Sequence, residues 1–271
     1  MLDHSTPELA VAQQAAAAAG QVLLDFAQAG FTVREKGVSD LVSEADVAAE
    51  TAVLARIRQA FPTHDVLAEE SQTELTATNV PEHLWIIDPL DGTTNYVHGI
   101  PHYAVSIAYL RDGQPECGVV FNPAREDLFV AVRNQGAWHN GKRLSVGPQT
   151  SLADCLVGLG FYYDRGAMME ATLATVQALF QTGIHGVRRF GTASLDLSAV
   201  ARGHYGAFFE YQLSAWDFAA GRLLVEEAGG RCTTALGEPL PIGRSSVLAS
   251  NGTLHPVMEK IIREKAGHLF A

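Results

Sequence analysis

Two aspartates three positions apart follow a strongly apolar run in the segment WIIDPLDGTTNYVHGIP, which begins at Trp85. The run predicts a strand buried on both faces, and Asp88 is expected to end it, because Pro89 cannot donate a ladder hydrogen bond. Pro89 and Gly92 then favour a sharp turn that brings Asp91 to the same side as Asp88. We therefore expect two converging carboxylates at the end of a strand, although the same residues are also ordinary turn formers.

The residues after the second aspartate, Gly-Thr-Thr-Asn at positions 92–95, are suited to binding an anion. Such a turn can leave several backbone amides pointing outward, as they do at helix N-termini that bind phosphate. Carboxylates beside a phosphate would repel it unless a cation lay between them. Hard divalent cations with oxygen ligands, Mg2+ above all, meet that requirement.

Two further acidic positions strengthen the hypothesis of a metal site. Glu69 and Glu70 end the apolar run of DVLAEES, although a pair of glutamates is also common at a solvated loop edge. Asp217 lies in the expected first turn of a helix in LSAWDFAAG. The spacing Ser214-x-x-Asp217 is also that of a capping box, which would favour an acid there without any metal.

The elements that must position these residues alternate between helices and strands. Helices are expected over residues 6–29, 43–60, 168–181, 194–202 and 214–228 and at the C-terminus; strands are expected over 64–68, 84–88, 104–110, 117–121, 127–132, 155–160, 186–190, 205–210 and 247–249. Alternating layers of helix and sheet are the natural packing of such a series.

Composition limits the function classes. The chain has 271 residues, 47% hydrophobic content and a net charge of −11, without a basic cluster, so nucleic acid is not expected as a partner. The alanine-rich N-terminal helix is too weakly apolar for a signal or a membrane span, which predicts a cytoplasmic protein with no membrane partner. Three well-separated cysteines indicate small buried side chains instead of disulfides or a zinc site.

Three motifs, LAEES, WIIDPLDGTTNYVHGIP and AWDFAAGRLLVEEAGG, in this order and spacing, resemble the inositol monophosphatase family of Mg2+-dependent, lithium-sensitive phosphatases. The resemblance runs from KGVSDLVSEADVAAE to Gly230 and implies a layered αβαβα sandwich and a homodimer. It also implies one catalytic unit over residues 1–271, with halves at 1–150 and 151–271. Ala68 stands where the family usually has glycine, and Ser43 where threonine is common; neither change removes a ligand.

The same resemblance implies two to three Mg2+ ions and their ligands. One ion is expected on Glu69, Asp88 and the carbonyl of Leu90. A second is expected on Asp88, Asp91 and Asp217, and Glu69 helps to hold a third, loosely bound ion. Lithium inhibition would follow from weak binding at the second site.

Catalytic and phosphate-binding roles carry over in the same way. Thr93 and Glu69 are expected to orient and deprotonate the attacking water, while Asp46 accepts the hydroxyl proton of Thr93. Asp46 is equally well placed as the capping-box acid of the helix over 43–60. The backbone of Gly92, Thr93 and Thr94 is expected to hold the phosphate oxygens.

The end of the substrate that does not react is expected to meet residues from the second half of the chain. The resemblance implies that Glu210 accepts hydrogen bonds from substrate hydroxyls beside Asp91 and Asp217, unless Glu210 is simply a solvated acid at a strand end. Lys36 is expected to lie in a loop and to add a positive charge near the outermost metal, unless it is merely solvated, as a lysine in a loop commonly is. The remaining expected contacts are backbone groups of Gly191, Thr192 and Ala193.

Three functions remain open at the level of sequence. The first is a phosphomonoesterase for a small polyol phosphate, with myo-inositol 1-phosphate foremost. The second is a sister activity on histidinol phosphate, fructose 1,6-bisphosphate or a nucleotide phosphate, since the metal-binding residues are shared. The third is a partner-binding protein that keeps the fold as a scaffold, although that role would need none of the acidic residues.

Overall fold

The computed structural model describes residues 6–37, 40–71 and 80–270, with side chains for all of these except residues 35–42. The helices of this part of the chain are α1 (Pro7–Ala29), α2 (Glu44–Ala60), α3 (Thr93–Val97), α4 (Ala167–Gln181), α5 (Ala193–Ala201), α6 (Ala215–Glu227) and α7 (His255–Ala266), with short 3-10 turns η1 (Leu152–Asp154) and η2 (Gly267–Leu269). None of the helices within the described ranges is long and apolar enough to cross a membrane.

A seven-stranded sheet belongs to the first half of the chain. Its strands, in spatial order, are β3 (Asp65–Ala68), β4 (His83–Asp91), β5 (Ala104–Arg111), β6 (Gln114–Asn122), β7 (Asp127–Val132), β8 (Gly136–His139) and β9 (Lys142–Arg143). Only β3 and β4 run parallel among these neighbours, and every other pair is antiparallel. The parallel pair is the one that ends at the acidic residues.

A five-stranded mixed sheet belongs to the second half. Its strands, in spatial order, are β11 (Gly186–Arg188), β10 (Leu156–Leu159), β12 (Ala207–Leu213), β14 (Ser245–Ser250) and β13 (Arg231–Thr233). A separate hairpin of β1 (Val33–Gly37) and β2 (Asp40–Ser43) precedes α2.

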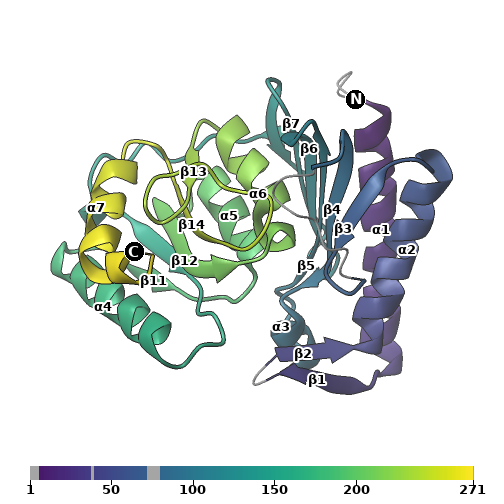
Figure 1. Ribbon diagram of the computed structural model, residues 1–271, viewed down its shortest axis with the longest axis horizontal. Helices are drawn as coiled ribbons and strands as arrows, with labels where there is room; N and C mark the ends of the chain where they lie inside the picture. Colours follow the sequence, from purple (N-terminus) through teal and green to yellow (C-terminus); the bar gives the residue numbers. More distant parts are fainter. Residues whose placement is uncertain (1–5, 38–39, 72–79, 271) are drawn as a thin grey trace.

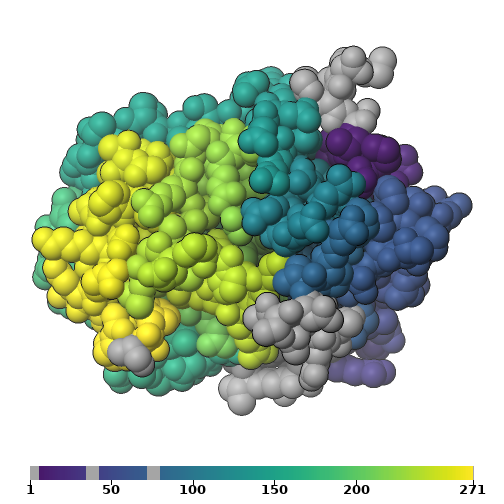
Figure 2. Space-filling view, turned by 45° about the horizontal axis from the view of Figure 1, so that its top comes forward, coloured from purple at the N-terminus to yellow at the C-terminus, as the bar shows by residue number. Residues whose placement is uncertain are grey.

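The elements stack in five layers, which confirms the predicted αβαβα sandwich (Figure 1). From right to left in Figure 1 the layers are α1 with α2, the seven-stranded sheet, α5 with α6, the five-stranded sheet, and α4 with α7. Figure 2 shows the purple-to-blue and green-to-yellow parts of the chain packed directly against each other. Helices α5 and α6 contact strands of both sheets.

Alternation along β4 explains why its apolar run is continuous. Trp85 and Ile87 are buried in the core under α1 and α2, whereas Leu84 and Ile86 are buried in the core shared with α5 and α6. Successive side chains of a strand point to opposite faces, so a strand covered on both sides needs apolar residues at every position.

Local capping signals in the sequence place several helix ends correctly. The hydroxyl of Thr6 caps α1, and Gly30 follows its last turn with a φ of 88°. Ser43 and Asp46 form the predicted capping box of α2. The three cysteines are buried and free, as expected from their spacing.

Two predictions about local structure are wrong. The strand does not end at Asp88, because β4 continues to Asp91 across an irregularity in its pairing with β5. Pro89 is accommodated there, since a residue in a bulge donates no ladder bond. Lys36 lies in strand β1 instead of a loop, and its side chain is outside the described part of the structure.

Candidate active site

The irregularity in β4 is what brings its two aspartates to the same face of the sheet. Asp88 pairs with Ser106 and Asp91 pairs with Ala104, so three steps on β4 match two steps on β5. In a regular strand, residues three apart point to opposite faces, and one extra residue in a bulge cancels that difference. Convergence of the two carboxylates was predicted correctly, but a bulge produces it instead of a turn.

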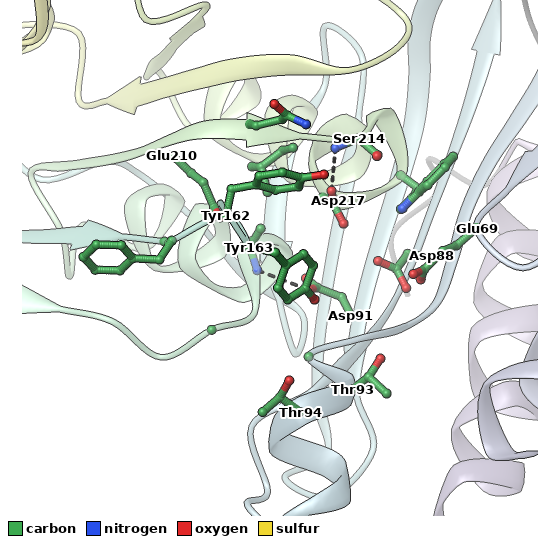
Figure 3. A pocket seen from close by; sticks show the side chains of 18 of the residues that line it. Glu69, Asp88, Asp91, Thr93, Thr94, Tyr162, Tyr163, Glu210, Ser214 and Asp217 are labelled. Atoms are coloured by element: carbon green, nitrogen blue, oxygen red, sulfur yellow. Dashed lines mark hydrogen bonds between the residues drawn. The ribbon is translucent and has the colours of Figure 1, made fainter. Parts of the chain in front are cut away.

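Neighbouring elements add two more acids. Parallel pairing of β3 with β4 ends at Ala68 and Ile87, and the Glu69 amide then donates to the Ile87 carbonyl at 3.2 Å, which places Glu69 next to Asp88 (Figure 3). Asp217 arrives from the first turn of α6. Ligand oxygens of Asp88, Asp91 and Asp217 all lie within 4.8 Å of one another. The structure thus brings acids from β4, from the turn after β3 and from α6 to one point.

Each of these aspartates is held in place by backbone amides. The Leu90 amide donates to Oδ1 of Asp88 at 3.0 Å. The Ser214 amide donates to Oδ2 of Asp217 at 2.6 Å, which is the capping box expected from the sequence. Asp217 can therefore cap α6 and belong to the acidic cluster at once, because the cap uses one carboxylate oxygen and leaves the other for the cluster.

Asp91 is anchored differently, by the N-terminus of α5. The amide of Ala193 donates to its Oδ1 at 3.2 Å and the amide of Ser194 to its Oδ2 at 2.7 Å. The Ala193 amide is thereby engaged with Asp91, whereas the sequence suggested backbone contacts between this position and substrate.

The electrostatics of the cluster are those of crowded, buried anions. Burial raises the pKa of Asp88, and Glu69, Asp91 and Asp217 raise it further. The pKa of Asp217 is also raised, first by burial and then by the negative charges of Asp91 and Glu69. For Asp91 burial raises the pKa to about 6, against the lowering effect of the amides that bind it. Like charges this close ionise together only when a cation compensates them.

The acidic cluster therefore fits a hard divalent cation. Its donors are carboxylate oxygens, the ligands that Mg2+ prefers, and they converge from fixed backbone positions. No cysteine or histidine belongs to the cluster found within the described residues, which disfavours softer metals. Asp88, Asp91, Asp217 and the adjacent Glu69 are thus the side chains able to hold such an ion.

Thr93 is oriented by a residue far away in sequence. Its Oγ1 lies 3.1 Å from Oδ1 of Asp46 and 3.1 Å from the carbonyl oxygen of Leu90. The other oxygen of Asp46 accepts from the amide and the hydroxyl of Ser43 at 2.8 and 2.6 Å. Asp46 can therefore cap α2 and fix Thr93 at the same time, so the two interpretations of this residue do not compete.

A cavity of about 210 Å³ opens over the cluster (Figure 3). Most residues assigned to the site from the sequence line it: Glu69, Asp88, Leu90, Asp91, Gly92, Thr93, Thr94, Gly191, Ala193, Glu210 and Asp217. Asp46 and Thr192 are not among the lining residues, and both are only 1% exposed. Thr192 is therefore not brought to the cavity wall, contrary to its expected contact with substrate.

Glu210 faces the cavity from β12 and is not a solvated strand-end acid. Its carboxylate packs so closely on Gly160 that a Cβ there would lie 1.8 Å from Oε2. Burial raises its pKa to about 8, with a further contribution from the buried Asp196 and an opposing one from Arg189. This part of the cavity thus holds a carboxyl group that is readily kept neutral near pH 7.

Several lining residues were missed by reasoning from the sequence. Tyr162 and Tyr163 line the cavity on the side of Asp217 and Asp91 (Figure 3), with ring centroids 5.5 Å apart. Arg189 and Arg244 line the same cavity and bring positive charge to it. The segment FYYDRG combines adjacent tyrosines with turn residues between a strand and a helix, and this was the available signal.

Comparisons with known proteins agree with the motifs. The model of the inositol monophosphatase family matches residues 4–266. Over 250 residues the chain is 42% identical to the Nus factor SuhB of Pseudomonas aeruginosa, covering 90% of this chain and 92% of that protein. Over 258 residues it is 40% identical to an inositol-1-monophosphatase of Rhizobium meliloti, covering 94% and 96%.

Solved structures show the same fold. The extragenic suppressor protein suhB of Bartonella henselae is 36% identical, with a TM-score of 0.87 and coverage of 95% of this chain and 99% of that one. An IMPase/NADP phosphatase in complex with Mg2+ and phosphate is 29% identical, with a TM-score of 0.79 and coverage of 89% and 90%.

After a chelator has removed bound metal, added Mg2+ should stabilise the protein more at about pH 8 than at about pH 5. Without a cation, the raised pKa of Asp91, about 6, means that its protonated form stabilises the fold. That contribution is complete below the ordinary value of 3.8 and is lost as the pH rises through about 6. Mg2+ then replaces the missing protons.

The measurement is the change in Tm on adding Mg2+ after chelation at each pH, with Na+ at matched ionic strength as the control. A shift of equal size at both pH values, or no shift, would contradict a cation site built from these carboxylates.

Proposed function

The chain belongs to the inositol monophosphatase family, and from this premise we propose that it is a Mg2+-dependent phosphomonoesterase for a small polyol phosphate, with myo-inositol 1-phosphate as the foremost substrate. The observation that carries the proposal is the meeting of Asp88, Asp91 and Asp217 within 4.8 Å at the floor of a cavity. We also propose that residues 1–271 act as one catalytic unit, since Asp88 comes from the first half and Asp217 from the second.

Two groups of residues would hold the cations. Glu69, Asp88 and the carbonyl of Leu90 form one group, and Asp88, Asp91 and Asp217 form the other, with Glu69 available to a third ion. When bound, Mg2+ neutralises phosphate charge, lowers the pKa of coordinated water and stabilises the leaving oxygen. Weak binding in the second group would make the enzyme sensitive to Li+, which has half the charge of Mg2+.

The chain's own residues orient the reactants. If a cation binds the Leu90 carbonyl, the Thr93 hydroxyl no longer donates to that carbonyl. It then donates to Asp46, 3.1 Å away. The lone pairs of Thr93 then point away from Asp46 and can accept a hydrogen bond from the attacking water. Glu69, beside Asp88 at the end of β3, is placed to accept the second proton of that water.

Phosphate oxygens would meet backbone amides at the start of α3. The first helical bond of α3 runs from the Tyr96 amide to the Gly92 carbonyl at 3.0 Å. Amides that precede it, at Gly92, Thr93 and Thr94, lie at a helix N-terminus, where they have no helical partner. All three residues line the cavity, so their amides can stabilise the charge of the phosphate.

Glu210 would read the hydroxyls of the substrate. It lines the cavity together with Asp217 and Gly191, at the side formed by the second half of the chain. A neutral carboxyl group can donate and accept, and an ionised one accepts strongly, so either form suits a polyol. Histidinol phosphate, fructose 1,6-bisphosphate and nucleotide phosphates remain alternative substrates, because the metal-binding residues do not distinguish them.

A second candidate function is the binding of a macromolecular partner. Its support is the 42% identity to a protein named a Nus factor. That the protein does not bind nucleic acid stays a prediction from its net charge. That it forms a homodimer stays a prediction from the family. Retention of every acidic residue of the cavity favours catalysis, because binding through an outer surface would not require them.

Phosphate release should be observed with Mg2+ from at least one member of a panel of polyol, sugar, histidinol and nucleotide phosphates. Asp88→Asn removes one charge from both proposed cation groups, so turnover should fall by about 100-fold or more, as when electrostatic stabilisation of a transition state is lost. Circular dichroism provides the control for folding. Release from no member of the panel would transfer support to the partner-binding function.

The effect of Glu210→Gln should grow with pH. Glutamine resembles the neutral carboxyl group, so at about pH 7 the loss in kcat/KM on inositol 1-phosphate should be less than about 3-fold. Above the Glu210 pKa of about 8 the wild type offers an ionised acceptor, and the loss should reach about 10- to 150-fold. A plain aryl phosphate, which has no hydroxyls to read, is the control. Equal losses on both substrates would mean that Glu210 supports the cation site or the fold.

A further inference from the structure

Helix α5 begins with an unusual exchange of capping groups. Thr192 occupies its N-cap position, where a threonine hydroxyl normally accepts a bond from the helix's own first amides, yet no such bond forms. Those amides, on Ala193 and Ser194, donate to the carboxylate of Asp91. An aspartate from β4, about a hundred positions earlier in the chain, thus caps α5 in place of the threonine.

The hydroxyl of Thr192 instead forms a hydrogen bond with a segment outside α5. Its Oγ1 donates to the carbonyl of His102 at 2.8 Å. The side-chain amide of Asn95 donates to the same carbonyl at 2.8 Å and to the carbonyl of Phe190 at 2.7 Å, and lies 3.2 Å from the Thr192 hydroxyl. We call Thr192, Asn95 and these two carbonyls the Thr192 clasp.

The clasp is buried and close-packed. Thr192 is 1% exposed and Asn95 8% exposed, so their bonds are shielded from competing water. Gly92 is pressed against it, because a Cβ there would lie 2.4 Å from the Thr192 hydroxyl and 3.2 Å from the His102 carbonyl. The φ of Gly92 is 94°, so this residue needs both glycine's small size and its conformational freedom.

Thr192 therefore constrains both the backbone and the carboxylate of Asp91. Its backbone continues into Gly92, which rests on the clasp, and its carboxylate is held by the helix that begins at Thr192. Displacement of Thr192 would move the start of α5 relative to β4, and with it the position of the Asp91 oxygens beside Asp88 and Asp217. Small displacements matter, because Mg2+ demands a near-ideal octahedral arrangement of ligands.

We propose that the Thr192 clasp is the positioning device that sets Asp91 for cation binding in the Asp88, Asp91 and Asp217 group. The inference rests on the proposed function, because it assumes that this group holds Mg2+. Neither Thr192 nor Asn95 lines the cavity, so both act as positioning residues. Their effect should appear in Mg2+ affinity, and not in the rate of the chemical step at saturating Mg2+.

The test is Thr192→Val, which keeps the shape of the side chain and removes its hydroxyl. The Mg2+ concentration needed for half of the Tm increase of the chelated protein should rise by about 2- to 12-fold, the equivalent of one lost neutral hydrogen bond. The Mg2+ dependence of phosphate release should shift by the same factor, with kcat at saturating Mg2+ within about 2-fold. Thr192→Ser, which keeps the hydroxyl, should restore the wild-type Mg2+ response.

Thr175→Val is the matched control. Thr175 is 0% exposed, and its hydroxyl bonds the carbonyl of Ala171 at 2.9 Å and the hydroxyl of Tyr211 at 2.6 Å. It belongs to α4 and does not line the cavity. This variant should lower Tm in chelator while leaving the Mg2+ concentration for half-maximal response unchanged.

The outcomes separate the two levels of the proposal. If the wild type shows no Mg2+ response at all, both the proposed function and the clasp's role are overturned. If the wild type responds and Thr192→Val responds at the same Mg2+ concentration, or if Thr175→Val shifts the response equally, only the clasp's role is overturned. Thr192→Ala, which removes the hydroxyl without a branched side chain, replaces Thr192→Val if the latter does not fold.

Discussion

Mutual repulsion among buried carboxylates is the constraint on which the rest of this structure depends. Asp88, Asp91 and Asp217 place oxygens within 4.8 Å of one another, and burial and proximity raise the pKa of each. Such an arrangement persists only if the backbone holds the acids firmly and a proton or a cation compensates their charge. Each acid is held by backbone amides, and three elements of the fold, β4, α5 and α6, end or begin at this point.

The layered fold explains how distant segments reach that point. The seven-stranded sheet supplies the end of β4, while the middle helix layer supplies the N-termini of α5 and α6, whose positive dipole ends face the acids. The second sheet contributes β12 and, with it, Glu210 at the far side of the cavity. Cation binding thus depends chiefly on the contact between the first sheet and the middle helices, whereas the choice of substrate depends on the second sheet and on the segment containing Tyr162 and Tyr163.

The sequence predicts those parts of the site that depend on local chemistry. Thr6 and Gly30 mark the ends of α1, and the spacing of Ser43 and Asp46 marks the start of α2, because capping involves residues only a few positions apart. The bulge in β4 could not be predicted, since a proline after Asp88 is equally compatible with a strand end. Tyr162, Arg189 and Arg244 were missed because their place in the cavity depends on how two sheets pack. The Thr192 clasp could not be predicted from the sequence either, because Asn95 and His102 lie about a hundred positions before Thr192.

Cation binding by the buried acids is best tested by locating the ions through anomalous diffraction from a crystal grown with Mn2+, which takes the same octahedral oxygen sites as Mg2+. One strong peak is expected among the carboxylates of Asp88, Asp91 and Asp217, and a second beside Asp88, Glu69 and the carbonyl of Leu90. A crystal saturated with Mn2+ that shows no peak between these carboxylates, or shows ions only at other surfaces, would contradict the claim that cation binding is what this arrangement of buried acids is built for.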